Sequence, residues 1–423
     1  MKPSMNLVEL AHAAGRAFTA TLSREEQREA GQFMTPPTIA SFMASRLVAG
    51  LERRAVRVLE PSAGAGILAA ATIEALLALP RPPEYIELLL CEMDARLLPV
   101  LERFAEDAKA LCAGAGVELE VVIQHGDFLL SELALSGQPV DGLLCTANPP
   151  FLKLNKADPR ALAHSYAVWG QPNIYSLFMA ACARLVPPNG RWCFITPRSW
   201  MAGAYFTATR RAMLRHMTID AIHTFESRRE GFQEDAVLQE TVITWASGRR
   251  EVDVGVNVLL TRSQGTIDLG AAEVVAVPTE RIVGADEHSM FSLPMPGLDP
   301  FEGWTATLKT YGLEVSTGPV IAFRAAAYIR ESRGGDTVPL LWLQHVGQQR
   351  IEWPIKKKRE HIVAAAANAW MLVKNEPMVI MRRFSPKEDE RRVTCAAYAC
   401  GLDRLPGAVI GLENHLNFIY RPG

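Results

Sequence analysis

The chain has 423 residues, of which 49% are hydrophobic and 21% charged, and its formal net charge is −2. This is the composition of a globular enzyme, and the length favours two domains over one. A membrane span is excluded because no apolar run approaches the roughly 18 residues that cross a bilayer. The start of the chain also lacks the apolar core of a secretory signal.

Charge distribution and cysteines narrow the class further. The residues from Met290 onward carry 17 Lys and Arg against 13 Asp and Glu. A mildly basic second half suits an enzyme that contacts phosphates with one domain. The seven cysteines are dispersed, which favours reduced thiols in a cytoplasm. Cys395 and Cys400 are the closest pair and no second Cys/His pair lies nearby, so we expect no metal site.

The first 150 residues alternate between helical and extended patterns. Residues 4–30 contain no Gly or Pro except Gly15, which predicts a helix. The Thr-Pro-Pro turn at 35–37 opens a second helix that runs to about Leu51. Strands are expected at 55–60, 85–94, 118–127 and 140–150, and helices at 65–79 and 95–113.

The alternation continues to about residue 247 and then stops. Helices are expected at 175–185 and 201–216, and strands at 191–197, 218–225 and 238–247. Strands separated by helices of this length predict an α/β fold, with a mostly parallel sheet and helices on both faces. From about Arg249 short strands and turns predict a second, mixed α+β domain. We place the domains at 1–265, with an N-terminal helical segment over 1–50, and at 266–423.

The first candidate site is the sequence VLEPSAGAGIL at 58–68. A strand ends at Glu60, and Gly64 and Gly66 stand where the chain must turn tightly into a helix, so the backbone can approach a ligand. An acidic residue before the loop would repel a pyrophosphate but suits a cationic sulfonium or amino group. An ordinary strand-to-helix turn is the alternative. The predicted cofactor-binding residues of this loop are Glu60, Pro61, Ala63, Gly64 and Gly66.

Two further acidic residues follow the next two strands. Glu92 lies one βα unit later, where a carboxylate can accept both ribose hydroxyls of a nucleoside. Asp127 can accept the amino group of an adenine, with Phe128 packed on the ring. Each alone is more often a surface acid. In this order, after the first loop, they describe an adenosine-shaped pocket along one edge of the sheet.

The most specific motif is Asn148-Pro149-Pro150-Phe151, directly after a strand. The two prolines stiffen the backbone and remove two N–H donors, which leaves carbonyl groups exposed. The Asn148 carboxamide oxygen and a proline carbonyl can then accept hydrogen bonds from one –NH₂ group, which draws the nitrogen of an aryl amine toward tetrahedral geometry and aims its lone pair at a sulfonium methyl. Phe151 can stack on the ring being modified. A proline-terminated strand with a core phenylalanine is the alternative.

This ordered set of motifs resembles the amino-methyltransferases, and NPPF is similar to the NPPY/F signature of their adenine branch. The sequence GQFMTPPTIASFMASRL at 31–47 resembles the segment before the cofactor loop in the gamma-type, TaqI-like DNA adenine methylases. STGPV and MRRFSPKEDERR are similar to stretches of the PstI/BsuBI-type modification methylases. The resemblance covers most of the chain, firmly from Gly31 to about Ser247.

The resemblance implies a Rossmann-like domain that binds S-adenosylmethionine, joined to a C-terminal target-recognition domain, with double-stranded DNA as substrate. Thr35 and Pro36 would touch the methionine end of the cofactor. Phe232 would stack on the second face of a flipped adenine. The resemblance also implies the modification enzyme of a type II restriction-modification system, which we expect to be a cytoplasmic monomer beside a cognate restriction endonuclease.

Contacts to DNA are expected from aromatic and basic residues. A target adenine must leave the duplex at a cost of about a few kcal/mol, which stacking on Phe151 and Phe232 and phosphate contacts would offset. Residues 153–172 are expected to form a loop that closes over DNA, with Tyr166 and Trp169 as contacts, or a surface loop without a role. The predicted phosphate contacts are Lys356, Lys357, Lys358, Arg382 and Arg383. A solvated charged face is the alternative for both basic clusters.

Two alternatives to a DNA adenine methylase remain open. NPPF-type methyltransferases also act on other amines, such as RNA bases or protein glutamine, but they would need neither the MTPP segment nor the basic C-terminal region. A catalytically silent DNA-binding homologue could retain the fold. It would have no chemical reason to keep Asn148, Glu60 and Glu92.

Overall fold

The structure is a computed structural model that forms two compact units, Met1–Asp299 and Pro300–Gly423. It describes residues 6–23, 25–26, 34–133, 140–225, 241–250, 256–294, 303–355, 359–385, 391–398 and 405–422. Among these residues no helix combines the length and the apolar character needed to cross a membrane.

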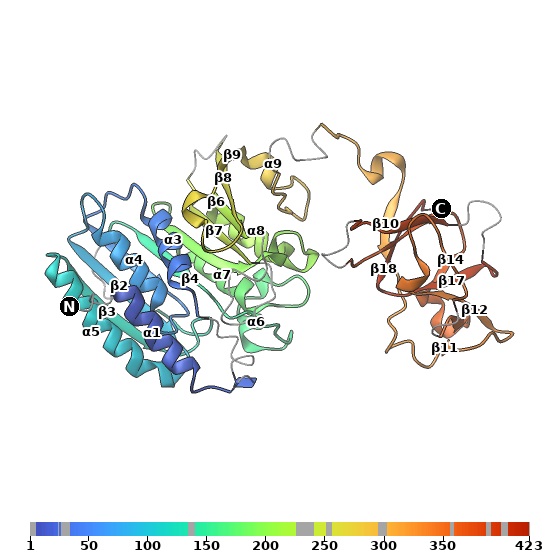
Figure 1. The fold of residues 1–423 in the computed structure, drawn as a ribbon, viewed down its shortest axis with the longest axis horizontal. Coiled ribbons are helices and arrows are strands. Elements are labelled where there is room, and N and C mark those ends of the chain that lie inside the picture. The colour runs from blue at the N-terminus through green and yellow to red at the C-terminus, as the bar shows by residue number, and fades with distance from the viewer. Residues whose placement is uncertain are drawn as a thin grey trace. The chain divides into compact units, whose positions relative to one another are not determined.

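The first unit is built on a sheet whose described strands have the order β3-β2-β1-β4-β5-β7-β6-β8-β9 (Figure 1). Strands β3, β2, β1, β4 and β5 are parallel, and β7 runs antiparallel between β5 and β6. The predicted α/β fold with a mostly parallel sheet is confirmed. The strands are β1 (Ala55–Glu60), β2 (Tyr85–Glu92), β3 (Glu118–His125), β4 (Leu143–Ala147), β5 (Arg191–Pro197), β6 (Met217–Phe225), β7 (Thr241–Gly248), β8 (Asn257–Ser263) and β9 (Val274–Pro278).

Helices cover both faces of this sheet. One buried apolar cluster joins α1, α3, α4 and α5 to the sheet, and a second joins α7 and α8 to the other face. Helix α4 is apolar almost all round because α1 and α3 pack on its side away from the sheet. The helices are α1 (Leu7–Thr19), α3 (Pro37–Val48), α4 (Ile67–Leu77), α5 (Leu98–Gly114), α6 (Pro159–Ala163), α7 (Ile174–Leu185), α8 (Thr207–His216) and α9 (Thr279–Ile282).

Helix α1 is shorter than the sequence predicts. The pattern predicted one helix over 4–30, whereas α1 ends at Thr19. Its buried positions are Leu7, Val8, Ala11 and Gly15, so the face that packs on the unit is exhausted before the helix ends. Helical propensity alone does not carry a helix far beyond the residues that tertiary packing stabilises.

The boundary between the units lies at 299/300, whereas the sequence placed it at 265/266. Strand β9 pairs antiparallel with β8, and α9 packs against both. The residues after 265 therefore complete the first sheet before the second unit begins.

The strand order fixes where a ligand can bind. From β1 the chain builds outward to β2 and β3, and then returns to place β4 on the other side of β1. The crossovers after β1 and β4 therefore leave in opposite directions, which opens a crevice at the carboxyl ends of these two strands. Glu60 ends β1 and Asn148 directly follows β4, so both stand at this crevice.

The second unit is a pair of small sheets with its own buried clusters. The described strand orders are β10-β18-β15-β16 and β11-β13-β12-β17-β14. Its strands are β10 (Glu314–Thr317), β11 (Ile329–Arg330), β12 (Thr337–Leu341), β13 (His361–Val363), β14 (Leu372–Lys374), β15 (Met378–Arg382), β16 (Cys395–Tyr398), β17 (Val409–Leu412) and β18 (Leu416–Tyr420).

Candidate functional site

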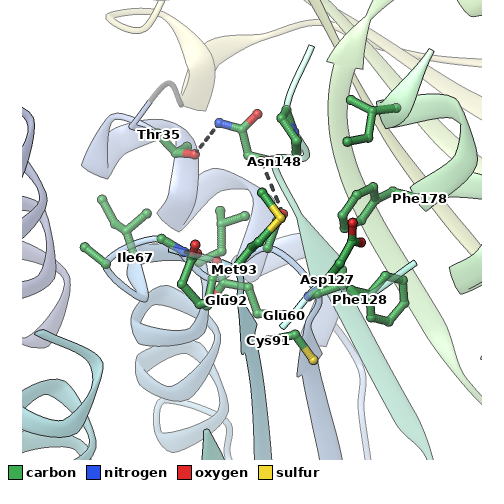
Figure 2. Close-up of a pocket in the computed structure, with 18 of the residues that line it drawn as sticks. Thr35, Glu60, Ile67, Cys91, Glu92, Met93, Asp127, Phe128, Asn148 and Phe178 are labelled. Carbon is green, nitrogen blue, oxygen red and sulfur yellow. Dashed lines mark hydrogen bonds between the residues drawn. The ribbon is translucent and has the colours of Figure 1, made fainter. Parts of the chain in front are cut away.

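Four polar side chains from consecutive strand ends line one pocket, the cofactor pocket (Figure 2). Glu60 comes from β1, Glu92 from β2, Asp127 from the turn after β3, and Asn148 from the segment after β4. The pocket holds about 850 Å³ of empty space, part of it open solvent. Sites for small molecules and cofactors have volumes of about this size.

Glu60 joins the end of β1 to the start of α4. Its buried carboxylate accepts a 2.8 Å hydrogen bond from the backbone N–H of Ala69 in the first turn of the helix. Gly66 precedes α4 with a φ of +81°, and a Cβ there would lie 3.1 Å from the Phe104 ring. This position therefore requires glycine both for its backbone conformation and for its packing.

Glu92 holds the glycine loop against β2. One carboxylate oxygen accepts the Gly64 N–H at 2.7 Å, and the other accepts the Asp94 N–H at 2.8 Å. Each carboxylate oxygen can accept a second hydrogen bond, so Glu92 can bind a ligand diol while it keeps the loop in place.

The cofactor pocket is electronegative. Burial raises the pKa of Glu60 well above its ordinary value, and the nearby Glu92 charge raises it further. Burial also raises the pKa of Glu92. Among the described lining residues, Glu60, Glu92 and Asp127 stand against one basic group, Arg160. A cationic ligand would stabilise these carboxylates in their ionised form, whereas a phosphate would be repelled.

Asp127 is oriented by two neighbours. Its Oδ1 accepts the Leu129 N–H at 2.9 Å, and its Oδ2 lies 3.8 Å from Nε of Arg160. Arg160 is itself held by the Asp158 carboxylate, with contacts of 2.8 and 2.7 Å. Nothing in the sequence pattern marked Arg160, because its place depends on how residues 153–172 fold back onto the turn after β3.

Residues 153–172 are docked on the first unit and contain α6. His164 Nε2 lies 2.8 Å from the backbone oxygen of Leu129, which adds a second contact to the turn after β3. At its end, the Leu154 N–H donates to the carbonyl of Pro172. The predicted loop is therefore a short helical excursion packed beside the cofactor pocket.

The segment after β4 is fixed by the turn before α3. The side-chain amide of Asn148 donates to Oγ1 of Thr35 at 3.0 Å, and Figure 2 shows the carboxamide oxygen on the side away from Thr35. The Ser62 hydroxyl donates to the Asn148 carbonyl at 3.4 Å. Pro150 lines the pocket, and Phe151 contacts Tyr175 edge-on with ring centroids 6.0 Å apart.

Apolar side chains complete the cofactor pocket. Phe128 stacks on Phe178 with centroids 5.3 Å apart, and Met93 is 61% exposed beside Glu92. The sequence reasoning did not single out Met93, Ile174 or Phe178. Ile174 and Phe178 are four residues apart on α7, so one helix face delivers both, and this spacing was a signal that could have found them.

Other predicted site residues lie at or beyond the edge of the cofactor pocket. Pro61, Ala63 and Gly64 line it, whereas Pro36 caps α3 and Pro149 is buried behind the lining. Phe232 and Lys356, Lys357 and Lys358 lie outside the described residues.

Arg382 and Arg383 belong to the second unit. Nε of Arg382 donates to the Val346 carbonyl at 2.7 Å, so this side chain has a structural partner within the unit. Arg383 is exposed and lies over the Phe384 ring, 5.3 Å from its centroid. Of the two, Arg383 therefore presents its charge to solvent more openly.

Comparisons with known proteins place this geometry in a family. Residues 145–232 match the Eco57I restriction-modification methylase model. The type II methyltransferase M.BsuBI of Bacillus subtilis is 30% identical over 94% of the chain and 79% of its own length. M.PstI of Providencia stuartii is 27% identical over 99% of the chain and 83% of its own length. The crystal structure of the type IIG restriction endonuclease BpuSI has the same fold, with a TM-score of 0.52 at 13% identity over 99% of the chain and 56% of that protein.

Proposed function

The chain belongs to the family of type II methyltransferases that includes M.BsuBI, and from that premise we propose that it methylates the N6 amine of adenine in double-stranded DNA. The methyl donor is S-adenosylmethionine. We propose further that the chain is the modification enzyme of a type II restriction-modification system.

One observation carries the adenine assignment. The Asn148 carboxamide stands at the strand end beside the cofactor pocket, and its orientation is set by the hydrogen bond to Thr35. Because the amide nitrogen donates to Thr35, the carboxamide oxygen remains the group that can accept from a substrate –NH₂. Pro149 and Pro150 contribute carbonyl acceptors and no competing N–H donors.

The residues of the cofactor pocket fit a sulfonium nucleoside. Three carboxylates against one guanidinium favour a positively charged ligand, and Glu92 is placed to accept hydroxyl groups. Bound there, S-adenosylmethionine supplies an electrophilic methyl group. Asn148 and the proline carbonyls polarise and orient the attacking amine, and this chemistry requires no basic side chain with a tuned pKa.

A flipped base also needs an aromatic surface. Phe151 follows the two prolines directly, and its ring rests edge-on against Tyr175. We propose that its face stacks on the target adenine and offsets part of the cost of unstacking. Phe232 remains our candidate for the second face of the base.

The decisive experiment is methyl transfer from labelled S-adenosylmethionine to unmethylated plasmid DNA, followed by nucleoside analysis. We expect the label in N6-methyladenine and a loss of about a thousandfold or more in rate for Asn148→Ala. Asn155→Ala, the same change at an exposed position seven residues downstream, is the matched control and should keep wild-type rates. Calorimetry with S-adenosylhomocysteine shows whether Asn148→Ala still folds and binds the cofactor.

Two outcomes would contradict the proposal. Label in RNA or protein, with none in DNA, would retain the chemistry and change the substrate. Label in cytosine, or full activity of Asn148→Ala, would remove the assigned role of the Asn-Pro-Pro segment.

A further inference from the structure

A second pocket, the α7–α8 groove, shares no lining residue with the cofactor pocket. It holds about 1250 Å³ of empty space, open solvent included. Its lining residues are Tyr166, Val168, Trp169, Arg184, Ala208, Arg211, Ala212, Arg215 and His216. Among the lining residues that the structure describes there is no Asp or Glu.

Three exposed arginines give the α7–α8 groove its charge. Arg184 comes from the C-terminal turn of α7, and Arg211 and Arg215 are four residues apart on α8, on one helix face. Like charges at this spacing repel each other. Arg184 and Arg215 form no ion pair with a carboxylate that the structure describes, and Arg211 donates to the uncharged backbone oxygen of Glu287.

The surroundings of His216 report the same positive potential. Burial lowers the pKa of His216, and the charges of Arg184 and Arg215 lower it further. The arginines therefore act on one shared volume rather than pointing apart into solvent. An anion bound there would relieve their mutual repulsion.

Two aromatic rings stand among these arginines. Tyr166 is 38% exposed and Trp169 is 57% exposed. The Arg184 guanidinium lies 4.7 Å from the Tyr166 ring centroid, and that of Arg211 lies 5.8 Å from the Trp169 centroid. Guanidinium groups stacked on aromatic rings suit a ligand that offers both phosphates and bases. An acidic peptide would use the charge but not the exposed rings.

We propose that the α7–α8 groove is a second anion site that binds the phosphodiester backbone of a nucleic acid. The proposal rests on the proposed function in that DNA is the expected partner. Helix α7 connects the two sites, since Ile174 and Phe178 line the cofactor pocket and Arg184 lines the groove. Ten residues of helix separate Ile174 from Arg184 by about 15 Å. A nucleic acid that reaches both sites must therefore extend well beyond the target base.

The test measures DNA binding by fluorescence anisotropy over a range of salt concentrations, using the full chain. The variant is Arg184→Ala combined with Arg215→Ala, and the probes are duplexes of about one and about four helical turns. For the long duplex we expect affinity at about 0.1 M salt to fall roughly fifty-fold, and the slope of log affinity against log salt to fall by about two. The short duplex should show a smaller loss.

The control is Arg81→Ala, which removes one exposed arginine in the turn between α4 and β2. Its affinity should stay within about twofold of the wild type, because each lost phosphate contact is worth about tenfold at this salt. Thermal unfolding of the double variant checks that it is folded.

Three results would overturn the proposal. The double variant could bind the long duplex with unchanged affinity and salt slope. It could lose binding to polyglutamate but not to DNA, which would assign the groove to an acidic protein. It could lose binding to adenosine diphosphate but not to DNA, which would assign the groove to a free nucleotide. Methyl transfer by the wild-type chain is measured separately, so an inactive enzyme that still shows the binding loss contradicts only the proposed function.

Discussion

At the scale of single residues, the geometry of the Asn-Pro-Pro segment depends on one hydroxyl group far away in the sequence. The side-chain amide of Asn148 donates to Thr35, 113 residues earlier in the chain. A carboxamide can rotate by half a turn and exchange its donor and acceptor ends. The hydroxyl of Thr35 therefore selects the orientation in which the oxygen accepts.

We predict that Thr35→Val lowers the rate of methyl transfer about tenfold, because a hydrogen bond of this kind is worth about 1 kcal/mol and its loss frees the carboxamide to rotate. Thr35→Ser keeps the hydroxyl and should retain most of the rate. Single-turnover kinetics at saturating cofactor measure this effect apart from cofactor affinity. Equal losses in the Val and Ser variants would show that the methyl group matters rather than the hydroxyl.

Gly66 is constrained more strongly than the other glycine of its loop. Its positive φ and the nearby Phe104 ring act together, whereas Gly64 has a φ of +55° and a more open surrounding. We predict that Gly66→Ala lowers the free energy of unfolding by about 2 kcal/mol and weakens cofactor binding. Chemical denaturation and calorimetry measure these two effects.

Gly114→Ala provides the comparison for Gly66→Ala. Gly114 ends α5, and a Cβ there would meet nothing within 4 Å. Its unfolding free energy should change little or increase. A Gly66→Ala variant as stable as Gly114→Ala would contradict the conformational argument.

At the scale of elements, β6 and β8 enclose a histidine that the proposed chemistry does not use. His223 on β6 is buried, and its ring nitrogens lie 2.9 Å from Oγ1 of Thr261 and 3.0 Å from Oγ of Ser263 on β8. Burial lowers the pKa of His223 to about 4, and the Arg46 charge lowers it further. The neutral ring thus belongs to the packing of the two strands.

The lowered pKa of His223 predicts a pH dependence of stability. Between pH 6.5 and about 4 the unfolded chain binds a proton that the folded chain does not, so stability falls as the pH falls through this window. The loss amounts to about 3 kcal/mol for a shift of this size. Urea denaturation at several pH values measures the slope. The slope should be shallower in His223→Gln, and an unchanged slope would assign the pH dependence to other groups.

At the scale of the whole molecule, the two units have separate buried cores. The first unit packs helices on both faces of its sheet, and the second packs two small sheets on clusters of their own. The residues proposed for cofactor binding all lie in the first unit.

We therefore predict that S-adenosylhomocysteine stabilises the two units unequally. At about a hundred times its dissociation constant it should raise the stability of the first unit by about 2.7 kcal/mol and leave the second unchanged. Differential scanning calorimetry of the full chain should then show one transition that moves with ligand concentration. A chain truncated after residue 294 should bind the ligand with unchanged affinity and fail to methylate DNA. If both transitions moved together, the units would not be independent.

Much of the first unit is determined by the sequence alone. Strand β1 and strand β5 have the predicted bounds, because short β-branched and aromatic runs flanked by helical patterns are a strong local signal. The sequence pattern also predicts that Glu60, Glu92, Asp127 and Asn148 lie at one edge of the sheet. The carboxyl ends of parallel strands meet at one edge, so residues at strand ends converge wherever the order of strands and helices is known.

Only the tertiary structure decided how far α1 extends, where the first unit ends, and what surrounds the polar residues of the cofactor pocket. Burial sets the end of α1, and the pairing of β9 with β8 sets the unit boundary. Arg160 reaches Asp127 because residues 153–172 fold back, and the arginines of the α7–α8 groove meet because α7 and α8 pack side by side. These contacts join residues that no local pattern relates, since hydrophobic periodicity reports which face is buried but not what it is buried against.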